Sequence, residues 1–496
     1  MAYPASLQIF PVIALVCVIV SLLVTGAGAE TMNLSDIRDL IPGGTDLDDR
    51  TLSELFNPEP VVSEEDAPFI KVVSENGYSV QQGAIVKVDF IRLAELGIVP
   101  DAEGNNADNP YYCITLPRSP DQTVPNDGEY PNGMSRNFRL QPDEAVVLIG
   151  TTPSGVKFYN YPTYLVYRTV GSERRLLFAG LGDCINIGDV KERTGSTDGF
   201  KKPIMIIYTA DQRVGEEVKS LALEQGYPEE TIFIKVIPSG MVRLGIEEED
   251  DTFACGIRTA VYDSPAVKEE YMEDVYTMSR PYRLTPLQGG FLDPYPVQDL
   301  KIRGTGRSEF NLMNPVSRLR DAIIAAYPDY SCTEPDTTIW IPESPEGLQN
   351  NKNSYGETRD TPYLHSENFT LGMDQFAVSY GVNHMASGKA VYSNIVAYGC
   401  EKLNGVASVD STRFDGSASR YIPDDSNAPF LYAYAITRSG SDDPYTLVVP
   451  DGPALSGIPV GDEMWIGWRA YMEPETKVGP VSHEIIYDKV LIFTPK

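Results

Sequence analysis

The chain has 496 residues, 42% of them hydrophobic, and its 70 acidic and 40 basic side chains give a formal net charge of -30. A surface this negative repels phosphate backbones and anionic lipid, so we expect no nucleic acid partner. The 41 glycines and 38 prolines indicate many turns and a strand-rich fold, and the length predicts two or three domains.

Residues 1–29 have the pattern of a secretory signal peptide. They contain no charged side chain, an apolar run covers 9–24, and small residues continue to Ala29, after which we expect cleavage. The run is short for a bilayer, so we predict no stable membrane span after cleavage and a protein that is secreted or lies in the endomembrane lumen. Asn33 and Asn368 begin glycosylation sequons, which such a route would use.

Five cysteines remain beyond the signal peptide. In an oxidising compartment we expect some of them to form disulfides, and the odd number leaves at least one unpaired. All spacings are long, which disfavours a zinc cluster. The five are Cys113, Cys184, Cys255, Cys332 and Cys400.

The next segments are an acidic flexible lead-in, residues 30–66, and a β-rich domain, residues 67–200. In the latter, Val86, Val88 and Phe90 alternate with charged residues and predict one face of a strand. Residues 101–108 form a loop with Asp, Glu and Asn oxygens at alternate positions, a composition that suits calcium, although the EF-hand pattern is absent.

Residues 201–300 predict an α/β region. A buried strand at 204–208, a helix capped by Asp211 and a second strand at 232–237 form a β-α-β unit with a parallel crossover. Ligands of open α/β sheets bind beyond the carboxyl ends of the strands, where Thr209, Asp211 and Ser239 make a candidate ligand-binding set. The alternative is that Asp211 only caps the helix and Ser239 only lies in a turn.

Residues 301–496 predict a β-rich α+β domain at the C-terminus. Asn314 is the expected cap of a helix whose buried face carries Val316, Leu319 and Ile323, and strands follow it. No internal repeat of fixed period is visible, which excludes a solenoid or propeller. The predicted fold class is mixed α+β, with a β-rich N-terminal part, a central α/β unit and a β-rich C-terminal part.

The histidines supply the sharpest chemical hypothesis. His384, His365 and Asp374 are residue types that bind divalent metals, and a histidine poised near neutrality also suits a general base. We predict a metal site from these three, with a divalent metal as the implied cofactor. The alternative is that His384 hydrogen-bonds within a loop and His365 lies exposed beside the sequon.

Three segments carry a resemblance to known sequences. Residues 356–361, 380–384 and 469–474 resemble a group of uncharacterised, predicted secreted proteins, and the likeness extends over most of 140–496. The group has no known activity to transfer. It directs attention to Glu357, Arg359, Asn383 and His384 as candidate catalytic residues.

Two functions therefore stand as hypotheses. The first is an extracellular hydrolase or metal-assisted enzyme centred on the His384 region. The second is a non-catalytic extracellular surface protein that binds calcium or another ligand, which would be a small molecule, a glycan or a cation. The strong catalytic motifs are missing from the chain, including H-E-x-x-H and G-x-S-x-G.

Overall fold

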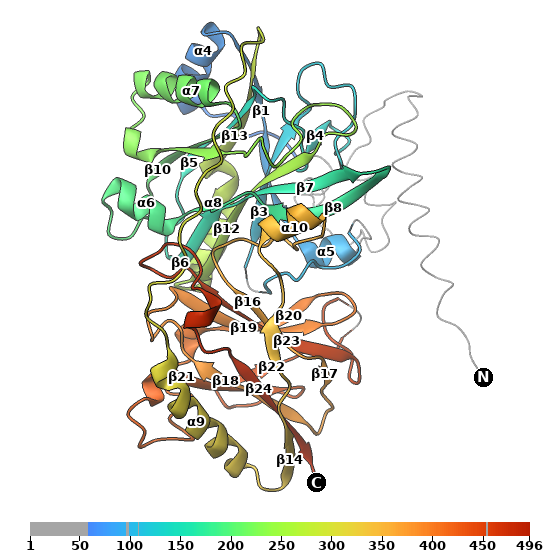
Figure 1. Cartoon of the computed structure of the whole chain (residues 1–496), viewed down its shortest axis with the longest axis vertical. Helices are drawn as coiled ribbons and strands as arrows, with labels where there is room; N and C mark the ends of the chain where they lie inside the picture. The colour runs from blue at the N-terminus through green and yellow to red at the C-terminus, as the bar shows by residue number, and fades with distance from the viewer. Residues whose placement is uncertain (1–57, 96–98, 108, 453–454) are drawn as a thin grey trace, which may run out of the picture.

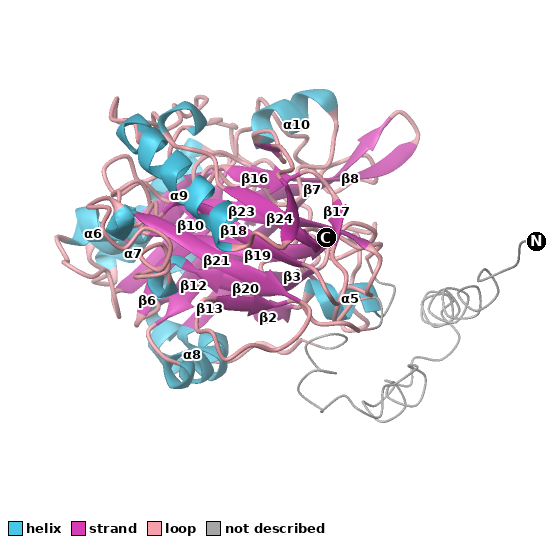
Figure 2. Ribbon diagram, turned by 90° about the horizontal axis from the view of Figure 1, so that it is seen from below, coloured by secondary structure: helices cyan, strands magenta, loops and turns pink. Residues whose placement is uncertain are grey.

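The structure is a computed structural model that describes residues 58–95, 99–107, 109–452 and 455–496. The predicted signal peptide, most of the lead-in and the Asn33 sequon lie outside these residues. The described part is mixed α+β, as predicted. Its strands form four sheets stacked along the long axis, with helices at both ends of the stack (Figure 1) and around its edge (Figure 2).

Two sheets pack face to face in the first half of the chain. The outer sheet 1 has the order β1 (Tyr78–Gln82), β13 (Ser279–Pro286), β5 (Ala145–Thr151), β10 (Pro203–Thr209), β11 (Ile232–Val236). The inner sheet 1 has the order β2 (Ala84–Val88), β3 (Tyr111–Pro117), β12 (Thr252–Tyr262), β6 (Val156–Tyr161), β9 (Ile185–Asn186), with β4 (Met134–Ser135) beside β3 and the hairpin β7 (Thr163–Val170), β8 (Glu173–Gly180) beside β12.

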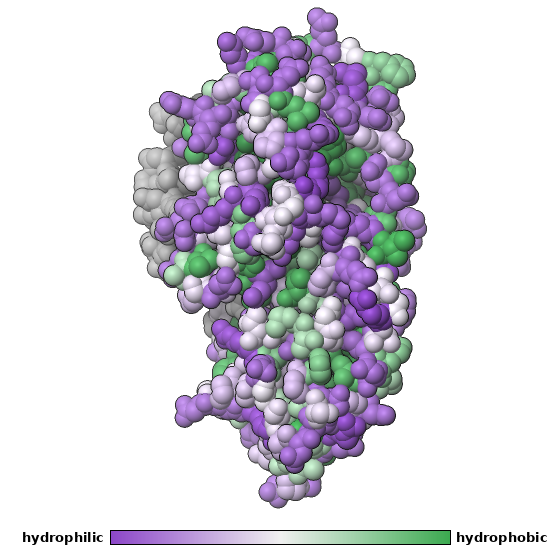
Figure 3. Space-filling model, turned by 90° about the vertical axis from the view of Figure 1, so that its left-hand side faces the viewer, coloured by the Kyte–Doolittle hydropathy of each residue, from purple (hydrophilic) through white to green (hydrophobic). Residues whose placement is uncertain are grey.

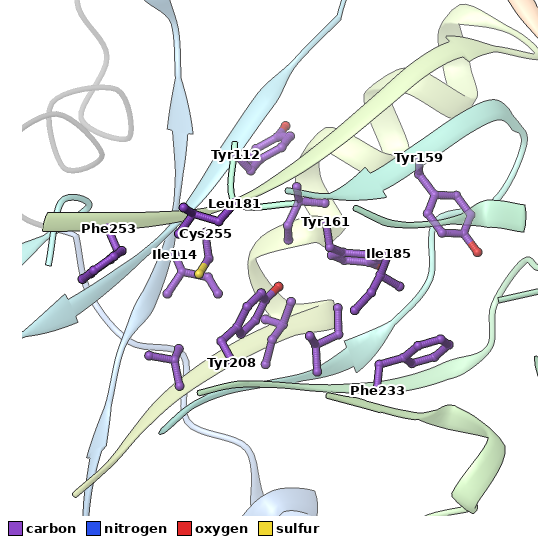
Figure 4. Packing of buried hydrophobic residues seen from close by; sticks show 14 of the residues in the cluster. Tyr112, Ile114, Tyr159, Tyr161, Leu181, Ile185, Tyr208, Phe233, Phe253 and Cys255 are labelled. Atoms are coloured by element: carbon purple, nitrogen blue, oxygen red, sulfur yellow. The ribbon is translucent and has the colours of Figure 1, made fainter. Parts of the chain in front are cut away.

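Apolar side chains of both sheets fill the space between them. Tyr208 of β10 and Cys255 of β12 belong to this core, which Figure 4 shows. The opposite face of outer sheet 1 is covered by α4 (Ala67–Glu75) and α7 (Gln212–Glu224). The first half is thus three layers, one of helices and two of strands.

The predicted β-α-β unit is confirmed. The strands β10 and β11 pair in parallel, and α7 connects them. Asp211 caps α7 by accepting a hydrogen bond from the backbone N–H of Val214, and Val218 and Leu221 are buried on the inner face. The strand predicted through Phe90 ends earlier, because Phe90 begins the helix α5 (Phe90–Glu95).

The second half has the same three layers. The outer sheet 2 has the order β14 (Tyr330–Thr333), β24 (Lys489–Pro495), β18 (Phe376–Val382), β21 (Leu431–Thr437), β22 (Thr446–Val448). The inner sheet 2 has the order β15 (Thr337–Ile339), β16 (Tyr363–Ser366), β23 (Glu463–Tyr471), β19 (Tyr392–Gly399), β20 (Gly405–Asp410), with β17 (Phe369–Thr370) beside β23.

The helix α9 (Met313–Ala326) covers outer sheet 2 with its predicted apolar face. Its N-cap is Leu312, so Asn314 lies inside the first turn rather than at the cap. The remaining helices are α6 (Ile187–Thr194), α8 (Pro265–Met278) and α10 (Ser344–Asn350).

The two halves are copies of one topology. The first strand of each half pairs with the last strand of the same half, β1 with β13 and β14 with β24. At the opposite edge of each outer sheet the last two strands are parallel, β10 with β11 and β21 with β22. Each half also begins with the helix that covers its outer sheet. We call residues 58–286 repeat 1, residues 309–496 repeat 2, and the connecting residues 287–308 the strap.

Matched residues support the duplication. The series Gly-x-x-x-Asp-x-Pro-Tyr occurs at 104–111 and again at 356–363. Gly256-Ile257-Arg258 on β12 corresponds to Gly467-Trp468-Arg469 on β23. Arg258 lies opposite Tyr111 and Asn160 in the sheet, and Arg469 lies opposite Tyr363 and Asn394.

The inner sheets face one another, and each repeat sends an arginine into the other. The Nη2 of Arg258 donates to the carbonyl of Gly356 at 2.9 Å, and the Nη2 of Arg469 donates to the carbonyl of Gly104 at 2.8 Å. Both glycines have φ of 65°, a backbone conformation that other residues adopt only with strain. Each guanidinium also lies near the faces of two tyrosine rings, Tyr111 and Tyr164 for the first and Tyr363 and Tyr398 for the second.

Main-chain hydrogen bonds repeat this reciprocity. The N–H of Gly104 donates to Leu403, and the N–H of Gly356 donates to Phe178. Equivalent residues of two copies thus exchange equivalent contacts, which is the arrangement of an isologous dimer interface.

All five described cysteines are free, so the expected disulfides are not present among them. Cys113 lies on β3 and Cys255 on the neighbouring strand β12. The residue opposite Cys113 is Gly256, which is one position beyond Cys255. Because side chains alternate along a strand, Cys113 and Cys255 point to opposite faces of the sheet.

No helix in the described ranges is long and apolar enough to cross a bilayer. The face shown in Figure 3 is largely hydrophilic, and its hydrophobic side chains form small scattered groups.

Replacing either reciprocal arginine should destabilise the whole chain. We expect Arg258→Ala and Arg469→Ala each to cost about 3 kcal/mol, because a glycine carbonyl loses its charged donor and a cavity opens between the repeats. Urea unfolding measures the loss. Arg175→Ala is the control, since Arg175 pairs with Glu173 at the surface, and its cost should stay within about 0.5 kcal/mol. Equal values for all three variants would contradict the assigned role.

Candidate functional site

His384 lies in the loop after β18 and is 1% exposed. Its Nδ1 is 2.9 Å from Glu309 Oε1, and its Nε2 is 3.2 Å from Asp488 Oδ2. Asp488 also accepts a hydrogen bond from the hydroxyl of Tyr432, and Glu309 accepts one from the backbone N–H of Ile486. Both ring nitrogens are therefore occupied by carboxylates.

The electrostatics make this residue an imidazolium. Burial alone would lower the pKa of His384, but the charges of Glu309 and Asp488 outweigh it and raise that pKa well above 6.5. A ring that donates from both nitrogens has no lone pair for a metal or for a proton. The geometry gives His384 the role of a buried cation that ties Glu309, the residue that follows the strap, to Asp488, which precedes β24.

The other candidate catalytic residues are separate from His384. Glu357 is 2% exposed and accepts hydrogen bonds from the backbone and hydroxyl of Ser344, and burial raises its pKa. Arg359 pairs with Asp183, as described below. Asn383 lies one position before His384, and its side chain accepts a hydrogen bond from the backbone of Ala386. These contacts are those of buried structural groups.

The three predicted metal ligands are not gathered. His365 lies on β16, half-buried, with its Nε2 3.1 Å from the hydroxyl of Thr338, and burial lowers its pKa. Asp374 lies in an exposed turn before β18. Within the described ranges, no group of three or more His, Cys, Asp and Glu side chains is placed to hold a metal.

Two of the three residues predicted to bind a ligand at the β10–β11 edge, Thr209 and Asp211, make hydrogen bonds within the protein. Thr209 donates its hydroxyl to the carbonyl of Glu144. The second oxygen of Asp211 accepts the N–H of Asp293, and the strap hydrogen-bonds the backbone here. Ser239 lies in a half-buried turn. The strap thus covers the edge where a ligand would bind.

The predicted calcium loop also turns inward. Glu103 is 6% exposed, and its Oε2 accepts the amide of Asn353 at 3.1 Å. Burial raises the pKa of Glu103 to about 7. Asp101 accepts the N–H of Glu103, so its carboxylate serves the turn. By contrast, Asn368 is exposed between β16 and β17, a position that suits a glycan.

One hollow of the described surface lies at the junction of the repeats. Its volume is about 510 Å³, within the range of about 300–1,000 Å³ that ligand sites occupy. We call it the open groove. Its walls are residues 87–92, Glu95, 105–107, 109–111, Lys268 and Met272 of repeat 1 and Gly405, Val406, Leu455 and Ser456 of repeat 2.

The duplication creates a counterpart, which we call the closed groove. It lies between the loop 356–363, the helix α10 and the end of β8, the equivalents of the open groove's walls. Arg359 fills it, donating to Asp183 at 2.8 Å, to Glu343 at 2.6 Å and to the carbonyl of Lys301 in the strap at 2.7 Å. The position of Arg359 in the repeated series is taken in repeat 1 by Ala107, which leaves space.

Sequence reasoning missed the open groove because no motif marks it. The signal that could have found it is the repeated Gly-x-x-x-Asp-x-Pro-Tyr series. Among the positions that differ between the copies, the fourth has the largest change in side-chain size, from Arg359 to Ala107.

Comparisons with known proteins assign no family. No family model matches the chain, and no curated protein does. Among solved structures, it is similar to an uncharacterized protein from Burkholderia cenocepacia, with 12% identity, a TM-score of 0.34 and 86% of each chain covered.

The buried imidazolium should make stability depend on pH in a predictable direction. The folded pKa of His384 is raised, so its contribution is complete below about pH 6.5 and is lost as the pH rises through the folded value. We expect His384→Gln to cost about 3–5 kcal/mol at pH 6. The difference between the unfolding free energies of the variant and the wild type should narrow as the pH rises above about 6.5 in urea unfolding. His365→Gln, which touches no carboxylate, is the control, and a gap independent of pH would contradict the imidazolium.

Glu103 should act in the opposite sense. Its folded pKa is raised from 4.5 to about 7, so the ionised carboxylate destabilises the fold above pH 7 and the penalty disappears as the pH falls. We expect Glu103→Gln to stabilise the chain by up to about 3 kcal/mol at pH 8 and to have little effect at pH 5. Thermal unfolding at both values measures this. The exposed Glu463→Gln should show no such difference.

Proposed function

We propose that this protein is an extracellular, non-catalytic binding protein whose ligand occupies the open groove. The observation that carries the proposal is the contrast between the two equivalent grooves. The closed groove is filled by Arg359 and the strap, whereas Ala107 leaves the open groove hollow. Binding at a junction of repeats needs only a rigid concave surface, and the reciprocal arginines hold the walls in place.

The lining favours a ligand that carries a carboxylate. Lys87 makes no ion pair with any residue that the structure describes, whereas Arg92 is paired with Glu95. The amide of Asn109 adds a planar hydrogen-bonding group, and the ring of Phe90 adds an apolar surface, whereas the amide of Asn105 is engaged by the backbone of Gly405. Cationic, amide and aromatic groups together suit an acidic sugar or a similar small acid.

The rival hydrolase centred on His384 receives no support from the geometry. A general base needs a free nitrogen, and a metal ligand needs a lone pair. His384 has neither, since Glu309 and Asp488 occupy both nitrogens. Extracellular placement stays a prediction from the leader.

Isothermal titration of the mature chain with glucuronate tests the proposal. We expect binding that glucose does not reproduce, and Lys87→Ala should weaken it about tenfold or more, because a charged hydrogen bond contributes about 1.5–3 kcal/mol. Lys157→Ala, at an exposed position on β6, is the matched control and should bind as wild type does. Equal affinity for glucuronate and glucose, or no binding of either sugar, would contradict the proposal.

A further inference from the structure

Lys235 is a buried lysine that lacks a carboxylate partner. It lies on β11, and 7% of the residue is exposed. Its Nζ donates to the carbonyl oxygens of Leu181 and Asp183, each at 2.7 Å, and it makes no ion pair with any residue in the described ranges. A buried ammonium normally needs an opposite charge to offset its lost hydration, and here it has two neutral acceptors instead.

The acidic groups around Lys235 are occupied elsewhere or uncharged. The carboxylate of Asp183 accepts a guanidinium N–H of the closed groove at 2.8 Å, and each oxygen of Asp360 accepts a side-chain amide. Burial raises the pKa of the thiols of Cys184 and Cys255, which therefore stay protonated. Burial outweighs the attraction of these groups and lowers the pKa of Lys235. Lys235 thus loses its proton at a lower pH than an exposed lysine does.

A small space lies beside the amine of Lys235. Gly182 stands between the two residues whose carbonyls hold Nζ, and its φ is 81°. A Cβ placed on Gly182 would lie 3.7 Å from Nζ and 3.7 Å from Cδ2 of Leu300, and among the described residues outside its chain neighbours nothing else would come within 4 Å. These are ordinary van der Waals distances, so a group of about a methyl's size fits there. Leu300 belongs to the strap and is 40% exposed, so the side chain that borders the space also reaches the surface.

The chemistry of a lysine in such surroundings favours an aldehyde. The electron pair of the neutral amine adds to the carbonyl carbon, and the carbonyl oxygen leaves as water with the two amine protons, which gives an imine. A proton taken from solvent converts the imine to an iminium ion, whose one N–H can still donate to the carbonyl of Leu181 or Asp183. The negative charges of Asp183 and Asp360 favour this cation, and they oppose the anionic carbamate that carbon dioxide would form.

From this geometry we infer that Lys235 is a covalent binding site for a small aldehyde, in the space between Gly182 and Leu300. The site lies between the sheets of repeat 1 and beneath the strap, and the inference does not depend on a ligand in the open groove. It adds a second kind of binding, in which a covalent bond and not a set of hydrogen bonds holds the ligand.

Reductive alkylation of the intact mature chain with acetaldehyde and cyanoborohydride tests the inference. The reagent reduces iminium ions and leaves an ethyl group on each amine that formed one, and peptide mass spectrometry locates that group. In a brief reaction at pH 6 with limiting acetaldehyde, we expect several-fold more label on Lys235 than on Lys157, which is exposed on β6. The excess should shrink as the pH approaches about 10.4, the ordinary pKa of an exposed lysine, because Lys157 then also becomes neutral.

Lys389 is the matched buried control. Its Nζ lies 2.7 Å from Glu473 and 2.6 Å from Glu484, and these hydrogen bonds and charges outweigh burial and raise its pKa. It should stay unlabelled at pH 6, which separates the effect of a missing carboxylate from that of burial alone.

The variant Leu300→Ala tests the location of the site. It enlarges the space beside Nζ at a partly exposed position, so labelling of Lys235 should become faster while labelling of Lys157 stays the same. Labelling of Lys235 no faster than that of Lys157 in the wild-type chain at pH 6 would overturn the inference. A rate at Lys235 that Leu300→Ala leaves unchanged would also overturn it. Neither result bears on glucuronate, so the proposed function stands or falls separately.

Discussion

The reciprocal placement of Arg258 and Arg469 is the constraint on which the rest of the molecule depends. Each guanidinium crosses between the inner sheets and donates to a glycine carbonyl of the other repeat. A buried cation is costly unless it is hydrogen-bonded, so each loop must present its carbonyl at a fixed place. The left-handed turns at Gly104 and Gly356 make that presentation feasible. These two loops then form walls of the two grooves.

The grooves differ because the two copies carry different side chains at equivalent positions of the same strand topology. In repeat 2 the series places Arg359 beside three acceptors, and the strap is drawn over it. The end of the strap is held in turn by Glu484, which accepts the N–H groups of Thr305 and Gly306, and by Glu309 against His384. The residue with the most suggestive chemistry in the sequence is thus an anchor for the segment that closes one groove.

Local pattern predicted much of the fold and little of the site. The β-α-β unit and the buried face of α9 followed from periodicity, because each element's apolar residues are close in sequence. The duplication did not, since repeat 1 has longer loops and the α7 crossover, and equivalent residues drift out of a fixed spacing. The role of His384 depends on Glu309 and Asp488, which are 75 and 104 residues away along the chain. Residue type alone cannot reveal partners at that separation. The cysteines are a second example, because their number suggested disulfides but the five described cysteines are free.

Comparing the residues of the closed groove with those of the open groove shows which properties differ between the two copies. The two grooves share the loop of the repeated series as a wall, and the closed one holds an extended segment through the paired carboxylates of Asp183, Asp189 and Glu343. Selection for catalysis would concentrate unpaired nucleophiles or bases at the hollow copy. What changed there instead is size and charge: Ala107 for arginine, Asn105 for glutamate, and Lys87 left unpaired within the described residues. Changes of that kind alter what is held and how tightly, which is what the proposed binding function requires.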